Sequence, residues 1–173
     1  RLVQRIVLLT VVIEAVGALF LAWRFAAYYP GPSALWHGVF QAVSAFNNAG
    51  FSSFSENLVP FQREASVLLV VAFLIILGGI SYTLLADVAR FRRFRRMTVD
   101  SRIVLVSTGV LLAGGILFIL VAEATNPQTL GPLPWAYKLV NAFFHAVVPR
   151  TAGFNSLNMA GLMEATLFLT MIL

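Results

Sequence analysis

Two short polar segments with nearly the same sequence interrupt an otherwise apolar chain. They read FNNAGFSSF over residues 46–54 and PRTAGFNSL over residues 149–157, and each contains an Ala-Gly-Phe triplet. The glycines of the triplets, Gly50 and Gly153, can adopt positive φ angles at little cost and turn successive carbonyls toward one line. Rings of such carbonyls replace the hydration shell of an ion. The segments therefore suggest that peptide oxygens bind a desolvated cation, although a glycine can also simply end a short helix.

Other side chains near these segments offer little chemistry. The serine and threonine residues of the loops lack a nucleophile–base arrangement such as Ser-His-Asp. His37 and His145 have no carboxylate or second histidine at ligand spacing, so helix packing is favoured over metal binding. The sequence has no phosphate-binding G-x-x-x-x-G-K-[ST] motif. We expect no cofactor and no enzyme, and an intramembrane enzyme with a re-entrant loop is strongly disfavoured.

The composition places the chain in the membrane class. Of its 173 residues 60% are hydrophobic and 11% are charged, and the mean hydropathy is +0.88. An ordinary soluble domain has roughly 25% charged residues. The net charge of +5 comes from 12 basic and 7 acidic residues, and there is no cysteine. Membrane lipid is therefore the expected surrounding, with no nucleic-acid partner, no disulfide and no thiolate metal site.

Long and short apolar segments alternate around the two loops. A helix needs about 20 apolar residues to span a bilayer core of roughly 30 Å. The long segments, the last of them cut off, are residues 2–25, 65–88, 102–122 and 159–173. Residues 34–45 and 135–148 are too short to cross, and each leads into a polar loop. The expected fold class is an all-α integral membrane protein in which helix, short helix, polar loop and helix occur twice.

Such loops have a physical requirement at membrane depth. Backbone without helical hydrogen bonds is tolerated there only where protein buries it or water reaches it. A loop such as NNAGF after a short helix therefore predicts a pathway filled by water or ions. The carboxyl end of a helix carries a partial negative charge, which favours a cation over an anion.

The repeated order predicts two structural units. Placing the first Ala-Gly-Phe triplet on the second gives an internal repeat, although FQAV at residue 40 aligns with FHAV at residue 144 one position out of register. We expect a first unit over residues 1–90, a basic cytoplasmic linker over residues 91–101 and a second unit over residues 102–173. The chain begins without methionine and ends inside an apolar segment, so we expect it to be part of a longer protein.

A cluster of arginines predicts the orientation of the helices. Its members within the RFRRFRR segment are Arg90, Arg92, Arg93, Arg95 and Arg96. The positive-inside rule places this segment in the cytoplasm, so both short helices re-enter the membrane from outside. The segment is a topology signal, and it is also a candidate docking patch for a regulatory partner or for anionic lipid.

Several motifs resemble those of one transporter family. SAFNNAGFS at residues 44–52 and PRTAGFNS at residues 149–156 resemble successive loops of the Trk/Ktr/HKT superfamily of potassium transporters, in particular of the KtrB type of subunit in bacterial Ktr systems. NPQTLG at residues 126–131 is also similar to a loop of that family. GGISY at residues 78–82 is similar to the family's Gly-Gly-Ile-Gly-Phe, from which Ser81 and Tyr82 depart.

The resemblance implies an architecture and a function. Four helix–pore-helix–filter-loop–helix repeats surround a pseudo-fourfold pore in that family, and this chain matches the second and third repeats. Potassium then crosses the bacterial cell membrane through a multi-pass subunit with a carbonyl-lined filter. The implied filter residues are Asn47, Asn48, Ala49, Gly50, Phe51, Arg150, Thr151, Ala152, Gly153 and Phe154. A homodimer, a cytoplasmic ring of nucleotide-binding regulatory subunits (KtrA-like) and activation by sodium are also implied. The alternative is a cation channel built from two copies of a two-repeat chain.

Charged and amide side chains near the loops are expected to support the filter. Arg150 is expected to point away from the ion path and to bind carbonyls or an acid, for which Glu123 and Glu14 are the candidates. Ionisable groups within a membrane span face the protein interior, and Glu14 is as well explained by packing as by an ion pathway. Asn47 and Asn48 are expected to stabilise the loop by hydrogen bonds rather than to line its entrance.

Overall fold

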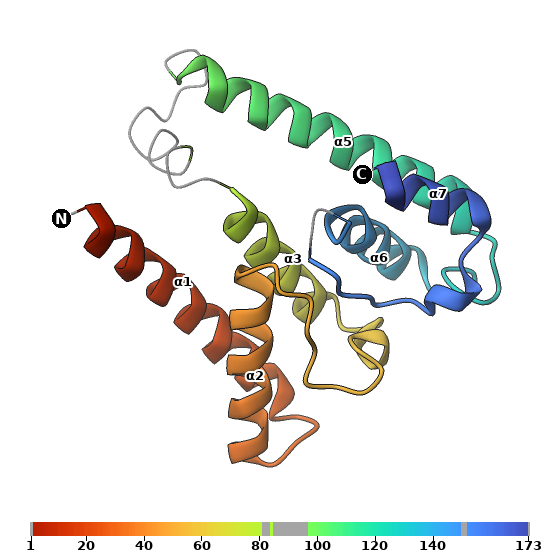
Figure 1. Ribbon diagram of the computed structural model, residues 1–173. Helices are drawn as coiled ribbons and strands as arrows, with labels where there is room; N and C mark the ends of the chain where they lie inside the picture. Colours follow the sequence, from red (N-terminus) through yellow and green to blue (C-terminus); the bar gives the residue numbers. More distant parts are fainter. Residues whose placement is uncertain (1, 81–83, 85–96, 150–151, 173) are drawn as a thin grey trace.

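The computed structural model describes residues 2–80, 84, 97–149 and 152–172, and these residues form helices and loops with no β-strand (Figure 1). The α-helices are α1 (Leu2–Phe25), α2 (Gly31–Phe46), α3 (Ala65–Gly79), α5 (Val99–Glu123), α6 (Trp135–Val147) and α7 (Glu164–Ile172). Short 3-10 turns, η1 (Val59–Phe61) and η3 (Met159–Gly161), precede α3 and α7. The all-helical expectation is confirmed for these residues.

Two helices are long and apolar enough to cross a membrane. They are α1, over residues 3–25, and α5, over residues 99–123. Large apolar side chains along both helices are exposed, among them Val16, Leu19, Leu117 and Val121. A helix that exposes apolar groups on most of its surface suits a lipid environment. The expected span over residues 65–88 is described as the 15-residue α3, and most of its second half lies outside the described residues.

Helix α2 begins before its predicted first residue, and helix α6 ends close to its predicted last residue. Helix α2 has 16 residues and starts at Gly31, before the predicted residue 34, with a proline in its first turn. Proline fits that position because its missing N–H has no helical partner there. Helix α6 has 13 residues and is preceded by Pro134. At 1.5 Å per residue these helices are roughly 24 Å and 20 Å long, so both remain shorter than a bilayer core.

The remaining differences in helix bounds have local causes. Helix α5 starts at Val99 rather than at residue 102, because the hydroxyl of Thr98 caps it by accepting a hydrogen bond from the amide of Ser101. Helix α7 starts at Glu164 rather than at residue 159, because Asn158 caps the separate turn η3. Side-chain oxygens at these positions satisfy amides that a helix leaves without partners.

Helix α3 lies between two groups of helices (Figure 1). It packs against α1 and α2 on one side and against α6 on the other. One apolar core contains buried side chains of α1, α2, α3 and α6 together with Phe154 of the second loop. A second core lies between α5, α6 and the segment that leads into α7. Buried apolar contacts therefore hold the short helices, and the position of each short helix sets the position of the loop that follows it.

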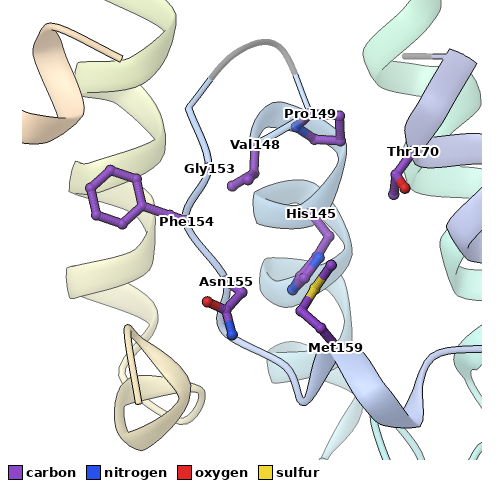
Figure 2. A pocket seen from close by; sticks show the side chains of 8 residues that line it. All are labelled: His145, Val148, Pro149, Gly153, Phe154, Asn155, Met159 and Thr170. Carbon is purple, nitrogen blue, oxygen red and sulfur yellow. The ribbon is translucent and has the colours of Figure 1, made fainter. Parts of the chain in front are cut away.

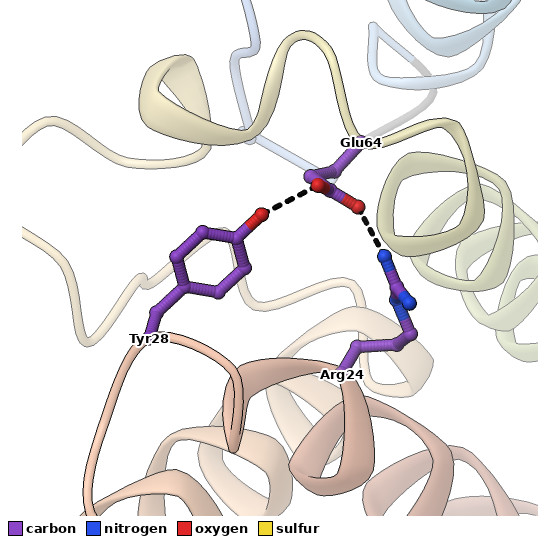
Figure 3. A network of polar contacts seen from close by, with 3 residues as sticks. All are labelled: Arg24, Tyr28 and Glu64. Atoms are coloured by element: carbon purple, nitrogen blue, oxygen red, sulfur yellow. Dashed lines mark hydrogen bonds and ion pairs between the residues drawn. The ribbon is translucent and has the colours of Figure 1, made fainter.

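A polar network connects the end of α1 with the start of α3 (Figure 3). Arg24 and Tyr28 each donate a hydrogen bond of 2.5 Å to a different carboxylate oxygen of Glu64, which directly precedes α3. The hydrogen bond from Tyr28, followed by that from Arg24, holds the pKa of the Glu64 carboxyl below its ordinary value of 4.5. The network therefore favours the ionised carboxylate at neutral pH.

Candidate functional site

The first loop, residues 47–58, turns sharply as it leaves α2. Asn48 has φ 51° and Gly50 has φ 75°, so the backbone enters the left-handed region at both residues, and it does so again at Asn57 with φ 56°. The amide of Ala49 donates to the carbonyl of Ser44 at 2.9 Å, and the amide of Asn47 donates to the carbonyl of Val43 at 3.0 Å. Glycine and asparagine are the residues that tolerate this region best, which explains why the sequence NNAG can follow the helix directly.

The second loop, residues 148–158, turns at the equivalent glycine. Gly153 has φ 68°, close to the value at Gly50. The amide of Ala152 donates to the carbonyl of Val148 at 3.0 Å. The side chains that follow the two glycines differ, because Phe51 is 70% exposed whereas Phe154 is 2% exposed and belongs to the core. The two loops therefore share a positive φ at their glycines but not the surroundings of their phenylalanines.

The two loops are in backbone contact at their glycines. A Cβ atom on Gly50 would lie 2.7 Å from the carbonyl oxygen of Ala152 and 3.1 Å from the Cα of Gly153. A Cβ atom on Gly153 would lie 3.1 Å from the Cα of Gly50. Further along, the amide of Leu58 donates to the carbonyl of Asn155 at 3.0 Å. Both positions thus require glycine for their conformation and for their close approach, and the carbonyl oxygen of Ala152 lies against Gly50.

Polar side chains of α2 hold the first loop. The hydroxyl of Ser44 donates to the carbonyl of Phe51 at 2.6 Å. Gln41, which is fully buried, donates through Nε2 to the hydroxyl of Ser52 at 2.6 Å. Nδ1 of His37 shares a hydrogen bond of 2.7 Å with the hydroxyl of Ser53. Three consecutive loop residues are therefore tied to successive turns of the short helix.

Helix α6 holds the second loop in a similar way. The hydroxyl of Ser156 donates to Oδ1 of Asn141 at 2.6 Å, and the amide of Ser156 donates to Nε2 of His145 at 3.4 Å. A cavity of about 410 Å³ lies beside this loop. Figure 2 shows His145 and Gly153 among the residues that line it. The cavity is lined by His145, Val148, Pro149, Gly153, Phe154, Asn155, Met159 and Thr170. Both histidines, for which packing was expected, thus also make polar contacts to the loops.

Asn47 and Asn48, the first two residues of the first loop, make different contacts. Nδ2 of Asn47 donates to Oε1 of Glu14 at 2.7 Å and to the carbonyl of Val43 at 2.9 Å. Oδ1 of Asn48 is buried and has no hydrogen-bond partner within the part of the chain that the structure describes. Gly79 of α3 lies next to Asn48, because a Cβ atom there would be 3.6 Å from Nδ2. The expected stabilising role fits the contacts of Asn47 and stays a prediction for Asn48.

Glu123 is fully buried at the end of α5 and accepts four hydrogen bonds. Asn126 and Thr129 donate to Oε2 at 2.7 Å and 2.6 Å. The amide of Met163 and the hydroxyl of Thr166 donate to Oε1 at 2.9 Å and 2.5 Å. The carboxylate therefore connects α5, the loop after it and the start of α7. The sequence interpretation named Glu123 as an acid for Arg150 and missed these neutral donors.

Other predicted residues lie outside the described part of the chain. They are Arg150 and Thr151 of the second loop, Ser81 and Tyr82 after α3, and the basic residues Arg90, Arg92, Arg93, Arg95 and Arg96. Their assigned roles remain predictions. Sequence reasoning also missed the loop contacts of Gln41, Asn141, Ser53 and Ser156. The FQAV–FHAV alignment was the available signal, because it pairs Gln41 with His145 and, one helical turn earlier, His37 with Asn141.

Comparison with known proteins identifies the class of this chain. The family model of TrkH, described as a cation transport protein, matches residues 1–173. The chain therefore belongs to the TrkH family of cation transport proteins, which is a family of transporters and not of enzymes. The expected membership of the Trk/Ktr/HKT superfamily is thereby confirmed.

Individual relatives cover the chain almost completely. It is 41% identical to the Ktr system potassium uptake protein B of Bacillus subtilis (strain 168), over 99% of this chain and 39% of that protein. It is 34% identical to the protein of the same name of Vibrio alginolyticus, over 100% of this chain and 38% of that protein. It is 35% identical to the potassium/sodium uptake protein NtpJ of Enterococcus hirae, over 100% of this chain and 38% of that protein. The chain thus spans about 38–39% of the length of these relatives.

Proposed function

We propose that this chain forms two repeats of a potassium uptake protein of the KtrB type and that its two loops contribute to a carbonyl-lined selectivity filter. The observation that carries the proposal is the backbone contact between Gly50 and Gly153, both with positive φ. Two relatives named as potassium uptake proteins match nearly the whole chain. Carbonyl oxygens at this contact replace the water around a potassium ion, and the ion gradient drives its movement.

The filter in this proposal consists of residues 47–51 and 150–154. The carboxyl ends of α2 and α6 lie directly before these segments and contribute the partial negative charge of a helix end. This charge favours a cation over an anion at the loops. Glu14 supports the first segment through Asn47, and Glu123 supports the second through the segment that leads into α7. Arg150 is assigned to the support of the second segment behind the ion path.

The architecture in this proposal is a repeat of helix, pore helix, filter loop and helix. Residues 1–90 form one repeat, residues 91–101 form the cytoplasmic linker, and residues 102–173 form the next repeat without the end of its last helix. The complete protein then surrounds one pore with four such repeats. The exposed apolar side chains of α1 and α5 support its placement as a multi-pass protein of a bacterial cell membrane.

Further partners follow from the same proposal. The name of the Bacillus relative refers to a Ktr system, which supports a partner subunit. We assign a cytoplasmic nucleotide-binding ring to this role, with residues 90–96 as the docking segment, and a homodimer as the assembly in the membrane. The name of the Enterococcus relative includes sodium, which supports sodium as an activating or accompanying ion.

Substitution of the glycines tests the filter. In the full-length protein, Gly50→Ser and Gly153→Ser place a side chain where backbone lies within about 3 Å, and they strain a positive φ. We expect the preference for potassium over sodium to fall by an order of magnitude or more, as a ~1.4 kcal/mol change in relative binding would produce. Ion uptake into a transport-deficient cell and into proteoliposomes measures the preference.

The control for these substitutions is Gly109→Ser on α5, where a Cβ atom would have no neighbour within 4 Å. It should leave the ion preference unchanged. If both loop variants fold and retain the preference of the wild-type protein, the filter assignment is wrong.

A further inference from the structure

The two short helices hold their loops with side chains at equivalent positions. His37 of α2 and Asn141 of α6 are 104 residues apart, and each contacts a serine hydroxyl, that of Ser53 or of Ser156. These two serines follow Gly50 and Gly153 by the same three positions. The same pairing in both units, with different helix side chains, indicates that the contact itself is the repeated feature.

A second contact, one helical turn later, reinforces each of these pairs. In the first unit Gln41 donates to the hydroxyl of Ser52 at 2.6 Å. In the second unit His145, at the equivalent position, accepts from the backbone amide of Ser156 at 3.4 Å. The chemical groups differ, but both contacts join the same turn of the short helix to the segment just after the glycine.

The direction of the Asn141 contact is defined by its other partners. Nδ2 of Asn141 donates to the carbonyls of Gln62 and Tyr137, both at 2.8 Å. Because only the Nδ2 group of Asn141 can donate to these two carbonyls, Oδ1 must face Ser156 and accept the hydrogen bond from its hydroxyl. Asn141, Ser156 and Gln41 are each fully buried. Buried hydrogen bonds of this kind keep their geometry, because breaking one leaves a polar group without a partner.

We propose that the His37–Ser53 and Asn141–Ser156 pairs are positioning contacts. They determine ion selection by fixing the spacing of the loop carbonyl oxygens around the ion. The proposal rests on the filter function proposed above. Sodium is smaller than potassium and needs closer oxygens, so a loop free to move inward accepts it more readily. A loop whose Ser53 or Ser156 is hydrogen-bonded to the short helix keeps its carbonyl oxygens at the wider spacing that suits potassium rather than sodium. Neither serine binds the ion itself.

The test uses the full-length protein in proteoliposomes, with potassium and sodium uptake measured separately. Ser53→Ala removes the half-buried hydroxyl, and Ser156→Ala removes the fully buried one. We expect each to lower the preference for potassium over sodium on the order of fivefold, as the loss of one hydrogen bond predicts. Ser53→Thr keeps the hydroxyl and should restore the preference.

Ser55→Ala is the matched control, since Ser55 is an exposed serine of the same loop, and it should keep the wild-type preference. Thermal unfolding of each purified variant shows whether it is folded. If Ser156→Ala does not fold, Ser53→Ala decides the outcome. Unchanged preference in the folded serine variants overturns the positioning role. The positioning role is judged from the potassium-over-sodium preference of each variant relative to that of the wild type. A wild-type protein that takes up no potassium contradicts the proposed function instead.

Discussion

At the scale of single residues, buried or partly buried carboxylates are matched by several hydrogen-bond donors. Glu123 receives four donors on its two oxygens, and Glu64 receives Arg24 and Tyr28. A carboxylate removed from water is costly unless such donors replace its hydration. These residues therefore act as junctions: Glu64 connects α1 with α3, and Glu123 connects α5 with α7.

The Glu64 junction predicts a dependence of stability on acid. Its pKa lies below the ordinary 4.5, first through the hydrogen bond from Tyr28 and then through that from Arg24. A depressed carboxyl pKa adds stability above the ordinary value, and this contribution is lost as pH falls through the folded-state pKa. We expect the melting temperature of the full-length protein in detergent to decrease below pH 4.5, with about 1 kcal/mol or less from this partly exposed group.

Glu64→Gln removes the charge and should lower stability at neutral pH while flattening the acid dependence. Glu56→Gln, at an exposed glutamate of the same connection, is the control. A Glu64→Gln protein whose melting temperature falls with acid as steeply as that of the wild type would show that other groups cause the dependence.

At the scale of helices, glycines allow α2 to approach both of its neighbours. A Cβ atom on Gly38 would lie 2.7 Å from the carbonyl oxygen of Ala18 in α1. A Cβ atom on Gly78 of α3 would lie 1.6 Å from the carbonyl oxygen of Phe46, the last residue of α2. The end of the short helix, from which the first loop starts, is therefore placed by direct contact with the backbone of α3.

Gly78→Ala is predicted to displace this end of α2. The added methyl group meets backbone, which cannot rotate away, so we expect destabilisation by about 1–3 kcal/mol and reduced potassium uptake. Thermal unfolding and uptake by the full-length protein measure the two effects. Gly114→Ala on α5 is a matched control, because a Cβ atom there has no neighbour within 4 Å. It should be neutral or slightly stabilising, since alanine favours a helix by about 1 kcal/mol over glycine. Equal melting temperatures for both variants would contradict the packing argument.

At the scale of the whole molecule, exposed apolar helices and the family assignment define a protein that functions within a membrane. Helix α5 has 25 residues, and at 1.5 Å per residue it extends roughly 37 Å, enough to place its ends on opposite sides of the bilayer. Its first residues follow the basic segment over residues 90–96, and its last residues precede the loop over residues 124–134.

The orientation derived from the arginines predicts which end of α5 is outside. In a full-length protein without other cysteines, Thr125→Cys should react with a membrane-impermeant thiol reagent added to intact cells. Asp100→Cys, at the opposite end of the helix, should react only after the membrane is opened. Both side chains are exposed, so burial does not distinguish them. The reverse labelling pattern would mean that the positive-inside assignment is wrong.

The amino-acid sequence by itself determined the helical segments, the two spans in α1 and α5, the polar loops and the family. These features depend on composition and on spacings of a few residues, which a linear sequence contains. Only the tertiary structure decided that Gly50 meets Gly153, that Gly78 meets Phe46 and that Ser53 and Ser156 are held from the short helices. Such contacts join distant residues, as in the bond from Asn141 to Gln62 across 79 positions. They depend on the direction in which each packed helix turns its side chains, which hydrophobic pattern alone does not specify.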